Sequence, residues 1–436
     1  MVTILLAGGQ STRFWPLKEK NLTRFFGKPL LVWHFEQLQR LHVRDVIVVV
    51  NSSQLEEVKR VPAPKRISVT YVTQEGKGQG KAVLAAGSVV KVGPALILNA
   101  SDIYEDELLK IILSEYKRDG SKMLMGAVRV GSYFPGGYLK LKASGTVEKI
   151  IEKPAPGKEP SDIVRLLVDL VPNMAKLHPM LAAYSKFSQD GYERALNKYL
   201  GEGTLCKPII TSHQWLYLKY PWHILNVMDT CLDTIAGQTI ARNVRIGKNV
   251  TLEGPLVLEE GVRILEGAKI VGPTYIGKGT IVGNNTMIRK SHIGDFCVIG
   301  FSTDITRSYI GNSCWLHTNF IGDSVIGEAV SIGAGTVLAN LRLDESTIFS
   351  QVEGEKVNTE RTKLGAIIGD NVRVGVHVSI MPGIKIGSNS FIGAGVILGE
   401  DIGEGMYCRI TPTVTISQNN AAAAAYPNRE QFRKAL

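Results

Sequence analysis

A short polar loop, AGGQSTR at residues 7–13, follows the first apolar run of the chain. Adjacent glycines let backbone N–H groups approach a ligand closely, and the arginine beside them favours an anion. The spacing matches neither the phosphate loop G-x-x-x-x-G-K-[ST] nor the dinucleotide fingerprint G-x-G-x-x-G. The loop therefore predicts a site for a phosphorylated ligand of another class.

Two single residues also have side chains suited to chemistry. Asp102 comes directly after the apolar run of "ALILNASD", and a carboxylate there can hold a hard cation such as Mg²⁺. His317 lies in "WLHTNFIGD", and an imidazole can accept a proton near neutral pH. Taken alone, each is more often structural, a capped turn or a surface histidine, so the surrounding elements must decide.

The first half of the chain alternates strands and helices. "VTILLA" and "DVIVVVN" are β-branched runs typical of buried strands, and "LLVWHFEQLQRL" between them has helical spacing. This order predicts a mostly parallel sheet with helices on both faces. Ligands bind beyond the carboxyl ends of such strands, which is where residues 7–13 fall.

After residue 235 an aliphatic residue recurs every six positions. The first run comprises Ile240, Ile246, Leu252, Leu258, Ile264, Ile270, Ile276, Val282 and Ile288, and the second comprises Ile368, Val374, Ile380, Ile386, Ile392 and Leu398. Such a period predicts a parallel β-helix in which each short strand buries one aliphatic side chain. Steps of five between residues 288 and 326, and an interruption at 341–363, mark the region where we expect a functional site.

Length and composition set the remaining bounds. A chain of 436 residues predicts more than one domain, and we place the boundaries at 1–230, 236–410 and a tail at 411–436. The net charge of +10 fits phosphate ligands. The sequence lacks a basic run with interleaved aromatic residues, so we do not expect it to bind nucleic acid. Five scattered cysteines and the lack of a signal-like or membrane-spanning segment predict a cytoplasmic protein with no membrane partner.

The loop at residues 7–13, continued by Pro16 and Leu17, resembles the signature of the sugar-1-phosphate nucleotidylyltransferases. The resemblance implies that Arg13 and Lys20 act on the phosphates and that Asp102 binds Mg²⁺. It also implies that the nucleotide and the sugar phosphate contact Ala7, Gly8, Gly9, Gln74, Gly78, Gly80, Glu152 and Lys153.

Some positions depart from that family. Arg165 and Leu167 stand where the family has the N-x-G that lines the sugar, and Tyr217 replaces a second metal-binding aspartate. Asn226 is a weak substitute candidate for that metal ligand. These departures leave two other interpretations open: a non-catalytic nucleotide-sugar sensor, or a nucleotidylyltransferase whose β-helix is only a scaffold.

The repeat half resembles acetyltransferases with a left-handed β-helix, above all those of the bifunctional N-acetylglucosamine-1-phosphate uridylyltransferase/glucosamine-1-phosphate acetyltransferase family. The matching stretch is "HTNFIGDSVIGEAVSIGAGTVLANLRL". The resemblance implies that His317 is the catalytic base, that Asn340 contacts the amino sugar and that the protein is a homotrimer. Lys363, with Lys356 and Arg361, is available for a phosphate. Counting strands, we expect His317 and Asn340 to flank one corner, in a site that a neighbouring chain completes.

Together these features predict an α/β Rossmann-like nucleotidylyltransferase domain followed by a left-handed parallel β-helix. The implied function is a two-headed transferase. One head would N-acetylate glucosamine- or galactosamine-1-phosphate with acetyl-CoA as co-substrate. The other would transfer a nucleotidyl group from UTP or dTTP to a sugar 1-phosphate with Mg²⁺ as cofactor.

Overall fold

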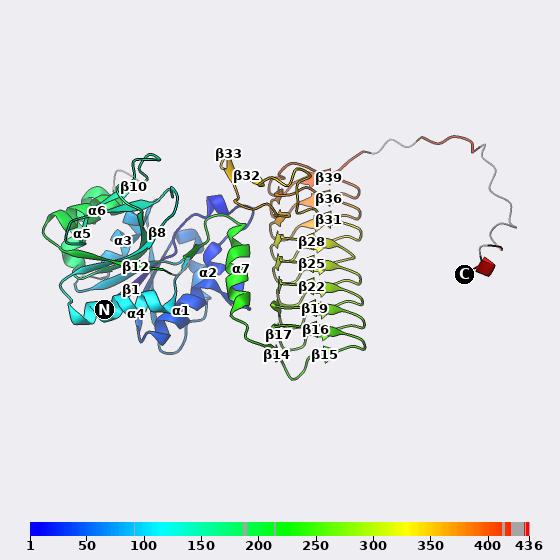
Figure 1. The fold of residues 1–436 in the computed structure, drawn as a ribbon, viewed down its shortest axis with the longest axis horizontal. Helices are drawn as coiled ribbons and strands as arrows, with labels where there is room; N and C mark the ends of the chain where they lie inside the picture. The colour runs from blue at the N-terminus through cyan, green and yellow to red at the C-terminus, as the bar shows by residue number, and fades with distance from the viewer. Residues whose placement is uncertain are drawn as a thin grey trace.

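The computed structural model describes residues 1–90, 92–185, 190–212, 215–411, 415–419, 431 and 433–435. It confirms the predicted α/β domain followed by a left-handed parallel β-helix. The two lie side by side, with helix α7 (His223–Asp233) between the sheet and the column of β-helix coils (Figure 1). The predicted tail at 411–436 falls largely outside the described residues.

The α/β domain contains one large sheet. Its strand order is β10-β9-β11-β6-β1-β4-β5, and β8 and β12 extend it beside β11. The strands are β1 (Val2–Leu6), β4 (Asp45–Val50), β5 (Ser68–Thr73), β6 (Ala95–Asn99), β8 (Met123–Arg129), β9 (Gly137–Leu141), β10 (Val147–Glu152), β11 (Ile163–Val171) and β12 (Cys206–Thr211). Strands β6, β1, β4 and β5 pair in parallel, whereas β11 is antiparallel to β6, β8 and β9. The sheet is therefore mixed rather than mostly parallel, because β9, β10 and β11 pair in the antiparallel sense with their neighbours.

Helices and short elements complete this domain. The helices are α1 (Leu30–Arg40), α2 (Leu55–Lys59), α3 (Gln79–Gly87), α4 (Asp106–Arg118), α5 (Met174–Tyr184) and α6 (Gly191–Gly201), with short 3₁₀ turns η1 (Thr12–Phe14), η2 (Lys20–Leu22) and η3 (Ser52–Gln54). Two short strand pairs are β2 (Arg24–Phe25) with β3 (Lys28–Pro29) and β7 (Asp102–Ile103) with β13 (Leu216–Tyr217).

The β-helix has three parallel sheets, here called faces 1, 2 and 3. Face 1 contains β14 (Gln238–Ile240), β17 (Leu256–Leu258), β20 (Thr274–Ile276), β23 (His292–Ile293), β26 (Tyr309–Ile310), β29 (Val325–Ile326), β34 (Ile367–Ile368) and β37 (Lys385–Ile386). Face 2 contains β15 (Arg245–Ile246), β18 (Arg263–Ile264), β21 (Ile281–Val282), β24 (Val298–Ile299), β27 (Trp315–Leu316), β30 (Ser331–Ile332), β35 (Arg373–Val374), β38 (Phe391–Ile392) and β40 (Tyr407–Cys408). Face 3 contains β16 (Thr251–Glu253), β19 (Lys269–Val271), β22 (Met287–Arg289), β25 (Asp304–Thr306), β28 (Phe320–Gly322), β31 (Val337–Leu338), β36 (Ser379–Ile380) and β39 (Ile397–Leu398).

The six-residue period corresponds to the buried core of this column. From Leu258 onward the repeating aliphatic side chains form one continuous buried cluster. The prediction was wrong for Ile240 and Ile246, which are 40% and 47% exposed. They belong to the first coil, which has a neighbouring coil on one side only.

The predicted steps of five are mostly short corners between faces 3 and 1. At these corners Lys290, Arg307 and Asp323 each take a positive φ, of 46°, 47° and 46°. Each is followed by a buried serine, and the serines bond from coil to coil. The Ser308 N–H donates to Ser291 Oγ, and the Ser324 N–H donates to Ser308 Oγ, both at 3.1 Å. This ladder holds three successive charged corner residues in one row.

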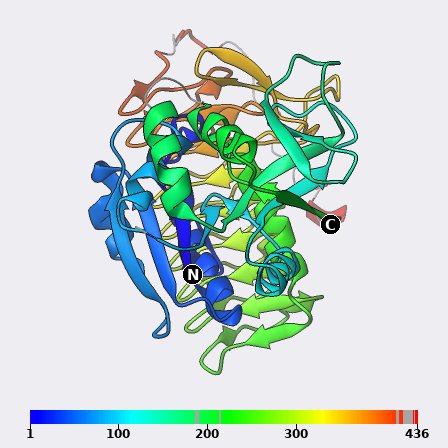
Figure 2. The same ribbon diagram turned by 90° about the vertical axis from the view of Figure 1, so that its left-hand side faces the viewer.

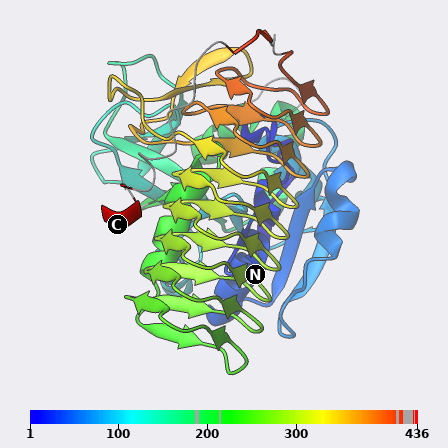
Figure 3. The ribbon, with the colours of Figure 1, turned by 90° about the vertical axis from the view of Figure 1, so that its right-hand side faces the viewer.

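Face 1 of the β-helix packs on the α/β domain, which lies in front of it in Figure 2. Rings from both domains stack there: Phe26 on Tyr275, Tyr275 on His292 and His292 on Tyr309, with centroids 4.8–4.9 Å apart. Viewed from the other side, the coils have no part of the α/β domain in front of them (Figure 3). No helix among the described residues has the length and apolarity to span a bilayer.

The interruption at 341–363 forms an arm from the β-helix. It carries the hairpin of β32 (Phe349–Val352) and β33 (Glu355–Asn358), which projects beside the α/β domain (Figure 1).

Candidate active sites

The loop at residues 7–13 lies at the carboxyl end of β1, as predicted. Gly8 is needed there because a Cβ atom would lie 2.5 Å from Oε1 of Gln74. The Gln74 side chain is thus packed against the loop, 8% exposed, with its amide donating to the carbonyl oxygen of Gly76. Asn51 donates to the Gly8 carbonyl at 2.5 Å, and Gln54 donates to that of Gly9 at 3.3 Å. Asn51, Gln54 and Gln74 thus support one side of the loop, and its other side is left for a ligand.

The second glycine pair begins helix α3. Gly78 has a φ of 107°, a conformation that favours glycine, and α3 starts at the next residue. A Cβ atom on Gly80 would lie 2.4 Å from Oγ of Ser185, so this glycine permits close packing of α3 on α5. Gly78 thus contributes a bare backbone at a helix start, whereas Gly80 has a packing role.

Lys20 lies close to the loop, with its Nζ 3.7 Å from the position of a Cβ atom on Gly9, and it interacts electrostatically with Asp102. Burial lowers the pKa of Lys20, and the negative charge of Asp102 opposes that shift. Burial raises the pKa of Asp102 to about 7, and Lys20 is the strongest opposing influence. Asn99 donates to Asp102 Oδ1 at 2.6 Å. Arg13 is exposed at the outer side of the loop. Three charges that the sequence linked to phosphate chemistry therefore lie around one loop.

Tyr217 lies directly opposite Asp102, paired with it between β13 and β7. This is the place where the resemblance expects a second carboxylate, and aromatic rings fill it. Trp215 packs on Tyr217 with centroids 4.6 Å apart, and its Nε1–H donates to Asp102 Oδ2 at 3.4 Å. Asn226 does not replace the missing ligand, because its Oδ1 accepts a hydrogen bond from Arg361 instead.

No group of three or more His, Cys, Asp and Glu residues suited to a metal occurs within the described ranges. A single carboxylate still fits Mg²⁺, which is commonly bound by one or two carboxylates together with substrate phosphates. Asp102 fits that role, with phosphates supplying the other oxygen ligands.

The expected sugar side of the site is more closed than the resemblance implies. Leu167 is buried in the core of the domain. Arg165 is buried as well, with its guanidinium 2.5 Å from Asp169 and 3.1 Å from Glu193. Arg165 thus has its charge matched inside the protein.

Glu152 and Lys153 end β10 on that side. Burial raises the pKa of the Glu152 carboxyl, and the negative charge of Glu193 acts in the same direction. Lys153 is exposed and takes a φ of 44°. Its ammonium group is therefore open to a phosphate.

In the β-helix, His317 and Asn340 lie at two different corners. His317 follows β27 and is exposed at the corner between faces 2 and 3. Asn340 follows β31 at the corner between faces 3 and 1. The prediction that they flank one corner was wrong, because each residue comes after its strand and the two therefore flank face 3 itself. Phe320 of β28 lies on that face between them.

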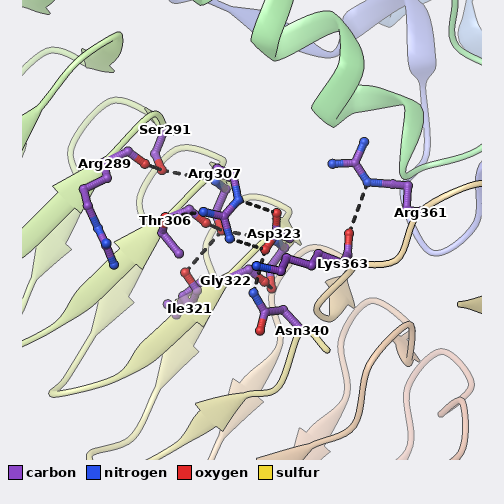
Figure 4. A network of polar contacts seen from close by, with 12 residues as sticks. Arg289, Ser291, Thr306, Arg307, Ile321, Gly322, Asp323, Asn340, Arg361 and Lys363 are labelled. Atoms are coloured by element: carbon purple, nitrogen blue, oxygen red, sulfur yellow. Dashed lines mark hydrogen bonds and ion pairs between the residues drawn. The ribbon is translucent and has the colours of Figure 1, made fainter. Parts of the chain in front are cut away.

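Asn340 belongs to a polar network at its corner (Figure 4). The Asp323 carboxylate is only 2% exposed and accepts hydrogen bonds from Nε and Nη2 of Arg307, both at 2.8 Å. It also accepts a hydrogen bond from Nδ2 of Asn340 at 2.6 Å. A carboxylate only accepts hydrogen bonds, so the amide nitrogen of Asn340 must face Asp323. Its amide oxygen is then directed away as a fixed acceptor. A Cβ atom on Gly322 would lie 2.5 Å from Nδ2, so glycine makes the arrangement possible.

The three basic residues of the arm are separated by the structure. The backbone of Lys363 forms an antiparallel β-bridge with Leu341, the residue after Asn340. Arg361 lies nearby, and its Nη1 donates to Asn226 Oδ1 at 2.7 Å. Lys356 is on the hairpin, 5.0 Å from the centroid of the Phe349 ring. Lys363 and Arg361 are therefore the two at the Asn340 corner.

Sequence reasoning missed Arg307, in the same row of corners, and Arg289, at the end of β22 next to that row. Arg289 pairs with Asp304 at 2.9 Å, and Arg307 is bound to Asp323. The signal that could have identified them is the phase slip, since two of the shortened steps, 288–293 and 305–310, contain these basic residues.

Comparisons with known proteins match both halves of the chain. A family described as "Nucleotidyl transferase" matches residues 2–167, and one described as "Bacterial transferase hexapeptide (six repeats)" matches residues 365–400. The chain is 31% identical to "Bifunctional protein GlmU" of Methanococcus vannielii, over 90% of this chain and 94% of that protein. It is 32% identical to the protein of the same name from Methanocaldococcus jannaschii, with coverages of 90% and 94%. It is 31% identical to "Bifunctional sugar-1-phosphate nucleotidylyltransferase/acetyltransferase" of Sulfurisphaera tokodaii, with coverages of 89% and 94%.

The raised pKa of Asp102 predicts how replacing it affects stability. The folded protein holds a proton on Asp102 up to about pH 7, whereas an unfolded aspartate releases it near 3.8. The contribution of the protonated group is therefore present below pH 3.8 and lost as pH rises to about 7. We expect Asp102→Asn, measured by urea unfolding without Mg²⁺, to gain stability relative to wild type across that window and level off above it. The exposed Asp45→Asn is the control. A difference that does not change with pH would contradict the assignment.

Proposed function

Because this chain belongs to the family of bifunctional sugar-1-phosphate nucleotidylyltransferase/acetyltransferases, it is a transferase, and we propose that residues 1–230 transfer a nucleotidyl group and residues 236–410 an acetyl group. The proposed substrates are a nucleoside triphosphate (UTP or dTTP), a hexosamine 1-phosphate and acetyl-CoA. The observation that carries the proposal is that one chain holds both Lys20 and Asp102 near the glycine loop and His317 across face 3 from the Asn340 network. A cytoplasmic location stays a prediction of the sequence.

In the α/β half, a phosphate oxygen of the sugar 1-phosphate attacks the α-phosphorus of the triphosphate, and pyrophosphate leaves. Arg13 and Lys20 balance the negative charge that develops on the leaving group. When bound, Mg²⁺ supplies charge neutralisation between the phosphates, and Asp102 would hold it. Gln74, which packs against Gly8, is the proposed contact to the base, and the exposed Lys153 is the proposed contact to the sugar phosphate.

In the β-helix half, the amine of the hexosamine attacks the thioester carbonyl of acetyl-CoA. The N–C bond forms, the C–S bond breaks and the thiolate of CoA leaves. His317 accepts the amine proton, a role that neutral imidazole can perform near physiological pH. The fixed amide oxygen of Asn340 accepts a hydrogen bond from the sugar, and Lys363 and Arg361 are available to its phosphate.

A second candidate applies to the α/β half alone. Tyr217 opposite Asp102 and the enclosed Arg165 and Leu167 favour a domain that binds a nucleotide sugar without turning it over. Failure of the wild-type protein to release pyrophosphate from UTP or dTTP with every hexosamine 1-phosphate tested would select this alternative.

The two activities are expected to separate by mutation. His317→Ala should lower kcat of acetyl transfer about 10²–10⁴-fold, the usual value of general-base catalysis, and leave pyrophosphate release unchanged. Asp102→Asn should do the reverse. His377→Ala is the matched control, because His377 is an exposed histidine at the same corner, further along the β-helix. Equal loss in His317→Ala and His377→Ala would show that His317 is not the base.

Asp323 is expected to act as a positioning residue for Asn340. In Asp323→Asn the new amide can donate as well as accept hydrogen bonds, so it no longer fixes the orientation of the Asn340 amide, which is free to flip. We expect KM for the amino sugar to rise about tenfold, as for one lost hydrogen bond with a charged partner, with kcat changed much less. Asp304→Asn, on the adjoining face 3 and paired with Arg289 rather than with Asn340, is the control. A fall in kcat at unchanged KM would contradict this role.

The exposed apolar residues of the β-helix support a homotrimer. Large apolar side chains are exposed on faces 2 and 3 and at their corners: Phe296, Phe301, Trp315, Val337, Val376, Phe391, Ile397 and Tyr407. Exposed apolar patches of this kind mark interaction sites. Face 1 is already covered by the α/β domain, so a second and third copy would pack on the two free faces.

Light scattering of the full chain should give three times the monomer mass of 47.6 kDa. Trp315→Lys, which places a charge among the exposed apolar residues beside His317, should lower that mass and reduce acetyl transfer while pyrophosphate release persists. Lys248→Trp, far from this patch in the first coils, serves as the control. A wild-type mass of one chain at micromolar concentration would contradict the trimer.

A further inference from the structure

The hairpin of the β-helix arm touches the glycine loop of the other domain. The Thr12 hydroxyl donates a hydrogen bond to Glu353 Oε1 at 2.6 Å, although the two residues are 341 positions apart in the chain. Thr12 belongs to the loop assigned to the triphosphate. A carboxylate from the acetyltransferase half is therefore placed at the anion site of the nucleotidylyltransferase half.

Packing fixes the position of this carboxylate. Glu353 and Gly354 form the hairpin turn with φ values of 51° and 87°, as two-residue hairpin turns require. Behind the turn, Val352 and Ile348 are buried in the core shared with Phe14, the residue that follows the glycine loop.

A buried lysine secures the arm from the other side. Lys385 donates to the carbonyl oxygen of Gln351 and forms an ion pair with Asp401 at 3.3 Å. Its ammonium group also lies 4.9 Å from the centroid of the Trp15 ring, next to the glycine loop. The hairpin and the loop are thus tied to the same coil of the β-helix.

Charges from the loop and from the hairpin act on the same phenol. Burial is the main cause that raises the pKa of the Tyr220 phenol, and three nearby charges modify it. Arg13 lowers that pKa, whereas Glu353 and Glu355 raise it. The phosphate-binding arginine and two carboxylates therefore surround one phenol. A triphosphate brought to Arg13 would meet like charge on the hairpin, which is repulsive.

We propose that Glu353 is an affinity-determining residue of the nucleotidylyl site, contributed by the β-helix domain. Its carboxylate accepts the hydrogen bond of the Thr12 hydroxyl before nucleotide binds, and this hydrogen bond breaks when the triphosphate arrives. The displaced charge weakens the binding of the triphosphate and of pyrophosphate alike, so it favours product release. This inference rests on the proposed nucleotidylyl function.

The test is Glu353→Gln in the full chain, which keeps an acceptor oxygen for Thr12 and removes the charge. Calorimetric titration with UTP and with dTTP should show binding about two- to fivefold tighter than wild type at low salt, the range of one exposed charge interaction. The gain should shrink as KCl is added, because salt screens exposed charges. A purely structural contact would not produce that salt dependence.

Glu355→Gln is the matched control, since it removes the same charge from the same hairpin without the Thr12 contact. Unchanged or weaker nucleotide binding in Glu353→Gln would overturn the inference, and so would an equal gain in Glu355→Gln. If neither UTP nor dTTP binds wild type or Glu353→Gln, the proposed nucleotidylyl function fails first, and the inference fails with it. Retained acetyl transfer in each variant shows that the chain is folded.

Discussion

The packing of face 1 of the β-helix against the α/β domain determines what the rest of the molecule can do. Its centre is a column of stacked rings in which Phe26 meets Tyr275, His292 and Tyr309. Two hydrogen bonds lock the column to the α/β backbone: the Phe26 N–H donates to His292 Nε2 at 3.1 Å, and the Tyr309 hydroxyl donates to the Arg24 carbonyl at 2.8 Å. Burial lowers the pKa of His292 to about 4, so the imidazole stays neutral and keeps its acceptor nitrogen at physiological pH.

This contact joins the two sites as well as the two domains. Arg24, Phe25 and Phe26 come shortly after Lys20, and Phe14 and Trp222 share a buried core with the base of the arm. The Pro16 carbonyl also accepts a hydrogen bond from Ser388 of the β-helix at 3.4 Å. The glycine loop therefore rests on coils of the other domain, and a change at the arm can reach it without passing through the sheet.

The parts of this structure that follow local rules could be predicted from the sequence. The six-residue period predicted the β-helix because each coil after the first buries equivalent side chains, and the glycine loop predicted its own place after β1. The Tyr217 replacement was also visible, and the structure puts it opposite Asp102. In contrast, the corners at which His317 and Asn340 lie depend on whether each residue comes before or after its strand. Counting strands does not specify that position. The Thr12–Glu353 contact gave no sequence signal at all, because it depends on the docking of two domains.

The two sites differ in how much of each a single chain supplies. The proposed α/β site is supplied by its own chain: Lys20 and Asp102 lose hydration on burial, which lowers the pKa of Lys20 and raises that of Asp102. The poorly hydrated ammonium group of Lys20 can then interact strongly with an incoming phosphate. The proposed acetyltransferase site is open, with exposed His317 at one edge of face 3 and the Asn340 network at the other. The base proposed there must release its proton after each turnover and would benefit from access to water, whereas the amine and thioester need to be held. A neighbouring copy on faces 2 and 3 would provide that confinement, and the α/β domain leaves those faces free by occupying face 1.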